Sequence, residues 1–170
     1  GKHTTLFYHN GELCAWLKDT AYLEGNDVVK TTKLSNVWKN DDIPKADLGN
    51  EGGVAFPRSK KPEKLLERII LLATNEGDYV LDSFLGSGTT AAVAHKMGRK
   101  YIGIELGDHC YSHCKKRLDR VIDGIDTGGV TKQYNWQGGG GYHFYELAPS
   151  LFVKNDKLPI YQINPDYSFE

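Results

Sequence analysis

A short glycine-containing segment constrains the fold more than any other part of the chain. Residues 86–91 read Gly-Ser-Gly-Thr-Thr-Ala, and they separate an apolar run at 79–81 from a helical pattern that extends to about Met97. Gly98 closes that pattern, and a second apolar run at 101–105 begins after only a short turn. The order strand, glycine loop, helix, strand is a βαβ crossover, whose two strands are parallel. The sequence therefore predicts an α/β, Rossmann-like fold with two buried strands.

Two further helices are predicted on either side of this unit. Pro62 and Glu63 suit the first turn of a helix, and Gly77 can serve as its stop. The apolar residues at helical spacing, expected on its inner face, are Leu65, Leu66, Ile69, Ile70 and Ala73. The other helix is predicted from Asp108 to about Ile122. Its expected inner face consists of Cys110, Cys114, Leu118 and Val121 or Ile122.

The two ends of the chain carry weaker patterns. Residues 1–23 suggest short strands or turns, and residues 24–61 are rich in Asn, Asp, Gly and Lys, which indicates irregular surface structure. After the flexible run Gly138–Gly141, residues 142–147 alternate as a strand does, and residues 154–170 read as a tail. We divide the chain into an irregular segment at 1–60, a Rossmann-like core at 61–125, and a hairpin and tail at 126–170.

Composition limits the class of protein. A chain of 170 residues with 39% apolar residues is long enough for one domain with a real core. The 21 basic and 22 acidic residues give a formal charge of -1, so a strongly basic nucleic-acid footprint is absent. Three cysteines do not suggest a disulfide framework, and the longest apolar run, 69–73, is far too short to cross a bilayer. We expect a soluble, cytoplasmic protein with no membrane partner.

The glycine segment has the chemistry of an adenosine-ligand site. It fits the G-x-G-x-x-G/A fingerprint, and Glu105 follows Gly86 by 19 residues at the end of the second strand, where it can accept hydrogen bonds from ribose hydroxyls. Asp82, directly before the loop, would repel a pyrophosphate but attract the ammonium of a methionine moiety. The Thr89 and Thr90 hydroxyls and the helix N-terminus could hold the methionine carboxylate. These residues favour S-adenosylmethionine over a dinucleotide.

These segments resemble the motifs of one enzyme family. Residues 80–90 closely resemble motif I of DNA amino-methyltransferases, and residues 98–105 resemble their motif II. Phe56 and residues 61–66 resemble motif X, and its position directly before motif I is the order of the β group. The resemblance covers roughly residues 31–152. The cofactor-binding residues that it implies, together with the chemistry above, are Lys61, Pro62, Asp82, Phe84, Gly86, Ser87, Gly88, Thr89, Thr90 and Glu105.

The segment at 139–152 resembles the C-terminal portion of the modification subunits of type III restriction systems. This resemblance implies a site-specific DNA methyltransferase with adenine N6 as the acceptor, although cytosine N4 uses a closely related pocket and stays open. It also implies double-stranded DNA as the partner of the full-length protein, together with a restriction subunit and a second modification subunit in a homodimer.

The tetrapeptide that performs the chemistry in this family does not occur in the sequence. Family enzymes use Asp/Asn/Ser-Pro-Pro-Tyr/Phe/Trp to bind the amine of a flipped base. The nearest string, Asn164-Pro165-Asp166-Tyr167, has the wrong third residue and comes after motif I. We interpret it as a turn in the tail. The chain is therefore expected to be a fragment that binds cofactor, contains no catalytic residue and transfers no methyl group alone.

Other readings of the sequence stay open. An NAD-dependent dehydrogenase half shares the glycine loop and the ribose acid, and a methyltransferase-like module without catalysis would also lack the tetrapeptide.

Trp38 and Trp136 could stack on a base. His109, Cys110, His113 and Cys114 could form a metal-binding edge, but core packing is the stronger reading because one helix cannot surround an ion with four ligands. The basic residues before the first helix, Arg58, Lys60, Lys61 and Lys64, could contact DNA phosphates or lie solvated.

Overall fold

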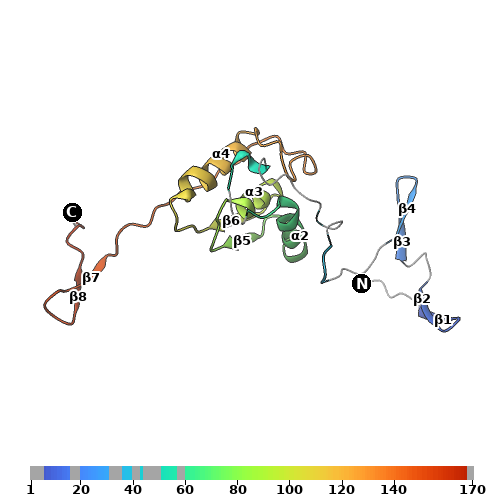
Figure 1. Cartoon of the computed structure of the whole chain (residues 1–170), viewed down its shortest axis with the longest axis horizontal. Coiled ribbons are helices and arrows are strands. Elements are labelled where there is room, and N and C mark those ends of the chain that lie inside the picture. Colours follow the sequence, from blue (N-terminus) through green and yellow to red (C-terminus); the bar gives the residue numbers. More distant parts are fainter. Residues whose placement is uncertain are drawn as a thin grey trace.

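The computed structural model describes residues 6–15, 20–30, 36–39, 43, 51–56 and 60–167. A central unit carries the helices and the parallel strands, and Figure 1 shows short hairpins extending from it toward both ends of the chain. The elements of the central unit are the 3-10 turn η1 (Glu51–Gly53), α2 (Glu63–Ala73), β5 (Tyr79–Asp82), α3 (Thr89–Lys96), β6 (Lys100–Gly103), the π-helix η2 (Cys110–Lys115) and α4 (Lys116–Ile122).

The predicted βαβ crossover is confirmed. Strands β5 and β6 pair in parallel, with Tyr79 opposite Lys100 and Asp82 opposite Gly103, and α3 connects them. Strand β6 begins one residue earlier than predicted and ends at Gly103. Ile104 still donates its amide to the Asp82 carbonyl at 2.9 Å, so the second strand continues to support the loop that follows β5.

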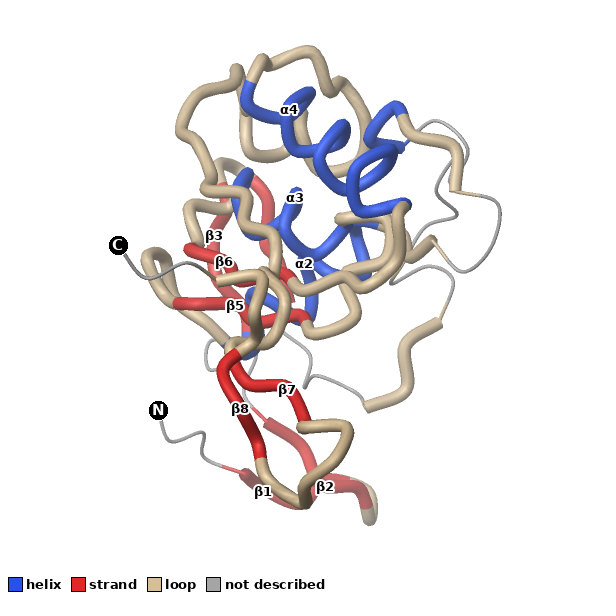
Figure 2. Tube along the Cα trace, turned by 90° about the vertical axis from the view of Figure 1, so that its left-hand side faces the viewer, coloured by secondary structure: helices blue, strands red, loops and turns tan. Residues whose placement is uncertain are grey.

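The core lies on the α3 side of the two strands. One buried cluster joins Ile70 of α2, Val93, Ala94 and Met97 around α3, and Val130. A second joins Leu85, Ala91, Cys114 and Leu118. Figures 1 and 2 both show α2, α3 and α4 gathered on the same side of β5 and β6.

The prediction of two buried strands was wrong, because only one face of each strand is covered. Val80 and Tyr101 pack against the core cluster of α3. Tyr79, Leu81 and Ile102 alternate with them and are each more than half exposed. Side chains alternate between faces along a strand, and no helix of the described residues covers the second face.

Helix α2 begins after Pro62, as predicted, but its inner face differs from the prediction. Ile70 is buried, whereas Ile69 is 42% exposed and Ala73 is also exposed. The buried positions of the helix are Glu63, Glu67 and Ile70. The helix ends at Ala73, where Thr74 donates its amide to the Ile70 carbonyl, so Gly77 belongs to the turn before β5 instead.

The predicted helix at 108–122 exists in two parts. Residues Cys110–Lys115 form a wider π-helix, and residues Lys116–Ile122 form the regular helix α4. Cys114, Leu118 and Val121 are buried as expected, and Cys110 is half-buried.

The ends of the chain form hairpins. Strands β1 (Leu6–His9) and β2 (Glu12–Ala15) pair with each other, as do β3 (Ala21–Glu24) and β4 (Asp27–Lys30). The strand β4 corrects the prediction that residues 24–61 are irregular throughout. The predicted strand at 142–147 is also wrong, because this segment pairs with nothing in a sheet. The hairpin of this region lies further on, between β7 (Phe152–Lys154) and β8 (Tyr161–Ile163).

Candidate functional site

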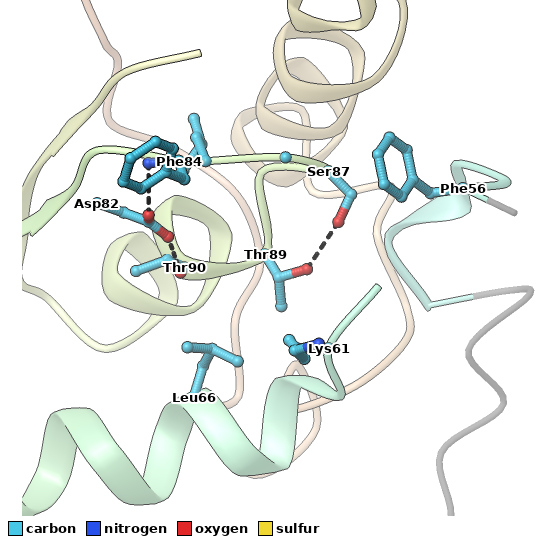
Figure 3. A pocket seen from close by; sticks show the side chains of 10 residues that line it. Phe56, Lys61, Leu66, Asp82, Phe84, Ser87, Thr89 and Thr90 are labelled. Carbon is cyan, nitrogen blue, oxygen red and sulfur yellow. Dashed lines mark hydrogen bonds between the residues drawn. The ribbon is translucent and has the colours of Figure 1, made fainter. Parts of the chain in front are cut away.

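A cavity of about 250 Å³ lies between the glycine loop and the start of α2. Figure 3 shows the loop side chains on one side of it, with Lys61 and Leu66 opposite. The predicted site residues that line it are Lys61, Asp82, Phe84, Gly86, Ser87, Thr89 and Thr90, joined by Phe56, Leu66 and Leu85. Pro62, Gly88 and Glu105 are not among its lining residues. The segments that resemble motif I and motif X thus meet across one cavity.

The loop backbone needs glycine at two positions. Gly86 and Gly88 have φ values of 59° and 79°, in the left-handed region that disfavours other residues. A Cβ atom on Gly88 would lie 3.1 Å from the Cα atom of Cys114, which is tighter than ordinary contact. Gly88 also precedes α3 as its N-cap. The two glycines therefore let the loop turn sharply and pack directly against η2.

Asp82 holds the loop and faces the cavity. Its Oδ1 accepts the Phe84 amide at 3.0 Å, and its Oδ2 accepts the Thr90 hydroxyl at 2.6 Å. Both bonds are drawn in Figure 3. An ionised carboxylate offers about four acceptor positions, so Asp82 retains capacity for a cationic ligand. The Thr90 hydroxyl, in contrast, already donates its only proton to Asp82.

Glu105 lies behind the loop. Its Oε2 accepts the Gly86 amide at 2.7 Å, and its Oε1 accepts the Gly107 amide at 2.9 Å. The Nε2 atom of His109 lies 3.2 Å from the same Oε1. The Gly107 hydrogen bond lowers the pKa of Glu105 below its usual value, and the Gly86 amide and His109 add to this against the opposing effect of burial. In this conformation the carboxylate fixes the loop, and its role toward a ribose stays a prediction.

A cluster of buried charges, which was not predicted from the sequence, lies behind the cavity wall. Glu63 is fully buried and pairs with Lys96 at 2.9 Å and with Arg117 at 2.7 Å. Lys96 also pairs with Asp126 at 2.7 Å. Arg117 donates to the Thr89 hydroxyl at 2.8 Å, so the cluster touches the cavity wall itself. The one signal in the sequence was that Arg117 follows Cys114 by three residues, at the margin of the predicted inner face.

The segment before α2 is part of the same arrangement. Pro62 provides no side-chain cap for the helix, and Glu51 caps it instead by accepting the Glu63 amide at 3.0 Å. Lys60 is buried, and its ammonium donates to the Val54 carbonyl at 2.9 Å. Burial is the main cause that lowers the pKa of Lys60 and raises the pKa of Glu51. The suggested DNA-phosphate role of Lys60 is therefore wrong, because this side chain lies inside the protein.

Trp38 and Trp136, which could have stacked on a base, have structural contacts. Trp136 donates its indole N–H to the Val121 carbonyl at 2.7 Å and packs edge-on against His95. The Arg68 guanidinium lies over the Trp38 ring, with its Cζ atom 4.9 Å from the ring centroid. Neither ring is among the residues that line the cavity.

The two histidines at and within η2 have partners of their own. His109 and His113 both pack against Phe56, and the His113 ring lies within hydrogen-bond distance of the Ala55 carbonyl. Among the described residues, no three His, Cys, Asp or Glu side chains are arranged to hold a metal ion.

The string Asn164-Pro165-Asp166-Tyr167 forms a turn, as expected. Asn164 accepts the Asp166 amide on its side chain and the Tyr167 amide on its carbonyl. Figure 1 shows this turn beside β8, at the end of the C-terminal arm and away from the glycine loop. Within the part of the chain that the structure describes, no helix is long and apolar enough to cross a membrane.

Comparison with known proteins decides the family. A family model described as DNA methylase matches residues 10–116, which is most of the chain and includes the whole cavity. The chain belongs to the DNA methylase family. The predicted resemblance to DNA amino-methyltransferases is thereby confirmed.

The sequences of two individual relatives agree with this assignment. The methylase chain is 48% identical over 152 residues to the probable type III restriction-modification enzyme HindVI Mod subunit of Haemophilus influenzae, a match that covers 88% of this chain and 20% of that protein. It is 54% identical over 84 residues to the DNA adenine methyltransferase YhdJ of Escherichia coli, which covers 49% and 27% of the two chains. The solved complex of M1.HpyAVI with SAM shares 28% identity over 58% of this chain and 44% of that chain, with a TM-score of 0.36. The methylase chain thus spans about a fifth of the length of its Haemophilus relative.

Proposed function

We propose that this chain is the S-adenosylmethionine-binding part of a site-specific DNA methyltransferase of a restriction-modification system. The observation that carries the proposal is the Asp82 carboxylate, which faces a cavity built by a left-handed glycine loop and the first turn of α3. Such a cavity offers a negative charge to an ammonium group and helix amides to a carboxylate, which are the two charged groups of a methionine moiety.

The residues present fit this cofactor. Asp82 has acceptor capacity left for the ammonium, and Thr89 and the free amides of the first turn of α3 suit the carboxylate. Phe56, Phe84 and Leu66 supply apolar walls. The volume of about 250 Å³ is slightly below the roughly 300 Å³ at which sites for drug-sized ligands begin, so the cavity suits one part of the cofactor, with the rest along its open side. When bound, the cofactor would supply an electrophilic sulfonium methyl group.

For the whole protein we propose methyl transfer to adenine N6 in double-stranded DNA. The name of the Escherichia coli relative, a DNA adenine methyltransferase, supports adenine as the base, and the name of the Haemophilus relative supports a restriction-modification system. The sequence contains no Asp/Asn/Ser-Pro-Pro-Tyr/Phe/Trp tetrapeptide, so we expect this chain to bind cofactor without transferring a methyl group. A restriction subunit and a second modification subunit are the proposed protein partners.

The dehydrogenase alternative predicts a different ligand. NAD would place a pyrophosphate near the loop, where the Asp82 carboxylate would repel it. The non-catalytic module predicts the same cofactor binding as the methyltransferase. It differs only in the whole protein, which would then fail to methylate DNA.

Calorimetric titration tests the cofactor. The purified chain is titrated with S-adenosylmethionine, S-adenosylhomocysteine and NAD, alongside Asp82→Asn and the control Asp123→Asn, which removes a charge from an exposed position. We expect both methionine-derived ligands to bind, and Asp82→Asn to weaken them about 10- to 150-fold, because a hydrogen bond to a charged group contributes about 1.5–3 kcal/mol. Binding of NAD alone, or equal effects of the two variants, would contradict the proposal.

A further inference from the structure

Thr89 stands between the cavity and the buried charge cluster. Its hydroxyl lines the cavity, and its Oγ1 accepts a hydrogen bond from the Arg117 guanidinium at 2.8 Å. Arg117 is fully buried, so it cannot contact a ligand in the cavity itself. A hydrogen-bonded effect of Arg117 on a ligand would therefore pass through Thr89.

The direction of this hydrogen bond determines what Thr89 can do. A guanidinium is a donor only, so the Thr89 oxygen must accept from it, and the Thr89 hydrogen is left for another acceptor. The Ser87 hydroxyl is one such partner, at 3.0 Å, and Figure 3 shows this bond at the cavity wall. Thr90 differs, because its hydrogen is directed at Asp82 at 2.6 Å. Of these two threonines, Thr89 is the one whose hydrogen can turn to an anion in the cavity.

Arg117 is held rigidly for this task. Its second nitrogen donates to Glu63 at 2.7 Å, and Glu63 is fixed in turn by Lys96 and by the Val130 amide at 3.0 Å. Gly52 packs against the guanidinium so closely that a Cβ atom there would lie 2.5 Å from its Nε atom. The guanidinium is therefore preorganised, and it does not need to move when a ligand enters.

The cluster as a whole is balanced in charge, which excludes a simple long-range attraction. Its two carboxylates, Glu63 and Asp126, balance its two cations, Lys96 and Arg117. The contribution of Arg117 to the cavity is thus directional and depends on the Thr89 hydroxyl. A hydroxyl that accepts from a cation is also polarised into a stronger donor.

We propose that Arg117 is a positioning residue, which orients and polarises the Thr89 hydroxyl as a donor to the carboxylate of the methionine moiety. This inference rests on the proposed function, because it assigns the anionic group of that cofactor to one side chain of the cavity.

The test compares two ligands, only one of which has the amino-acid end with its carboxylate and ammonium. S-adenosylhomocysteine has the amino-acid end, whereas 5′-methylthioadenosine keeps the adenosine and a thioether and lacks that end. We expect Thr89→Val to weaken S-adenosylhomocysteine roughly tenfold or more and to change 5′-methylthioadenosine less than about twofold. Thr89→Ser keeps the hydroxyl, so it should weaken S-adenosylhomocysteine much less than Thr89→Val does.

A double-mutant cycle then tests Arg117 itself, with circular dichroism as the folding control. Arg117→Met should weaken S-adenosylhomocysteine selectively in the unchanged background and have no further selective effect in the Thr89→Val background, because the relay is already broken. Arg117→Lys retains the charge beside Glu63 and replaces Arg117→Met if that variant does not fold. The variants Thr89→Val and Thr89→Ser leave the charge cluster unchanged.

The outcomes separate this inference from the proposed function. Equal losses for both ligands, or additive effects in the cycle, would mean that Arg117 only supports the structure. Unchanged selectivity in Thr89→Val would also overturn the inference while the cofactor assignment stood. Failure of the unchanged chain to bind S-adenosylhomocysteine would overturn both.

Discussion

Glu63 is the residue whose charge we expect to matter most for stability, and Glu63→Gln tests this. The side chain is fully buried and accepts hydrogen bonds from Lys96 through both oxygens, from Arg117 and from the Val130 amide. Glutamine has nearly the same shape, but it removes the negative charge. It also turns one acceptor into an NH2 group that faces donors.

The expected loss of folding stability in Glu63→Gln follows from this geometry. Removing one partner of a buried ion pair leaves an uncompensated charge, which costs about 3–5 kcal/mol. That is a large part of the roughly 5–15 kcal/mol by which a domain is stable. At about 2–4 °C per kcal/mol for a chain of this size, the melting temperature should fall by about 6–20 °C.

Thermal unfolding followed by circular dichroism measures the loss. The matched control is Lys115→Gln, which breaks the exposed pair between Lys115 and Asp119 at 2.9 Å. Such surface pairs contribute roughly 0–1 kcal/mol, so the control should shift the melting temperature by only a few degrees. If Glu63→Gln unfolds within a few degrees of the control, the cluster is not the electrostatic support described above.

Three further predictions concern the loop. Gly88→Ala should lower the melting temperature by a few degrees, because a left-handed residue with a Cβ atom costs about 1–2 kcal/mol, and an unchanged midpoint would argue against this strain. Burial raises the pKa of Cys114 to about 12, so its thiol, which donates to the Gly86 carbonyl, should resist iodoacetamide at about pH 8 until the chain is denatured, as followed by mass spectrometry. The lowered pKa of Glu105 should stabilise the fold above the usual carboxyl pKa of 4.5 and lose this contribution as the pH falls through the lower folded value. The melting temperature should therefore fall more steeply with decreasing acidic pH in the unchanged chain than in Glu105→Gln. The same pH dependence in both would refute this.

The sequence predicted the βαβ unit and most of the cavity because both depend on local patterns. The apolar runs around residues 80 and 102, the glycines at 86 and 88, and the position of Asp82 are all short-range features that a strand-to-helix junction requires. The cavity brings most of these residues together with Lys61, whose place came from the family motif.

The inner face of α2 could not be predicted in the same way. A helical pattern assigns apolar residues to the core and charged residues to the surface, so it placed Ile69 inward and gave Glu63 a place in the first helical turn but none in the core. Glu63 is buried because its partners, Lys96 and Arg117, stand 33 and 54 residues further along the chain. Charged side chains are almost never buried unless paired, and pairing across such separations leaves no periodic trace.

The prediction of a strand at 142–147 was wrong for a related reason. Alternation shows which side chains could share a face of a strand, but a strand also needs a neighbouring backbone to pair with. Tyr142 is instead held by its hydroxyl, which donates to Asp119 of α4 at 2.7 Å, and Tyr145 and Leu147 lie in solvent.

The π-helix η2 determines the rotation between the side chains that precede it and those that follow it in the site. A wider turn adds about one residue, which is roughly 100° of rotation in an ordinary helix. The Phe56-facing histidines lie in or just before this turn, and Arg117 lies after it. Deleting a single residue such as Ser112 would restore an ordinary helix but turn one set away from its partners. The extra residue thus works as a spacer that lets one helix contact both Phe56 and the charge cluster.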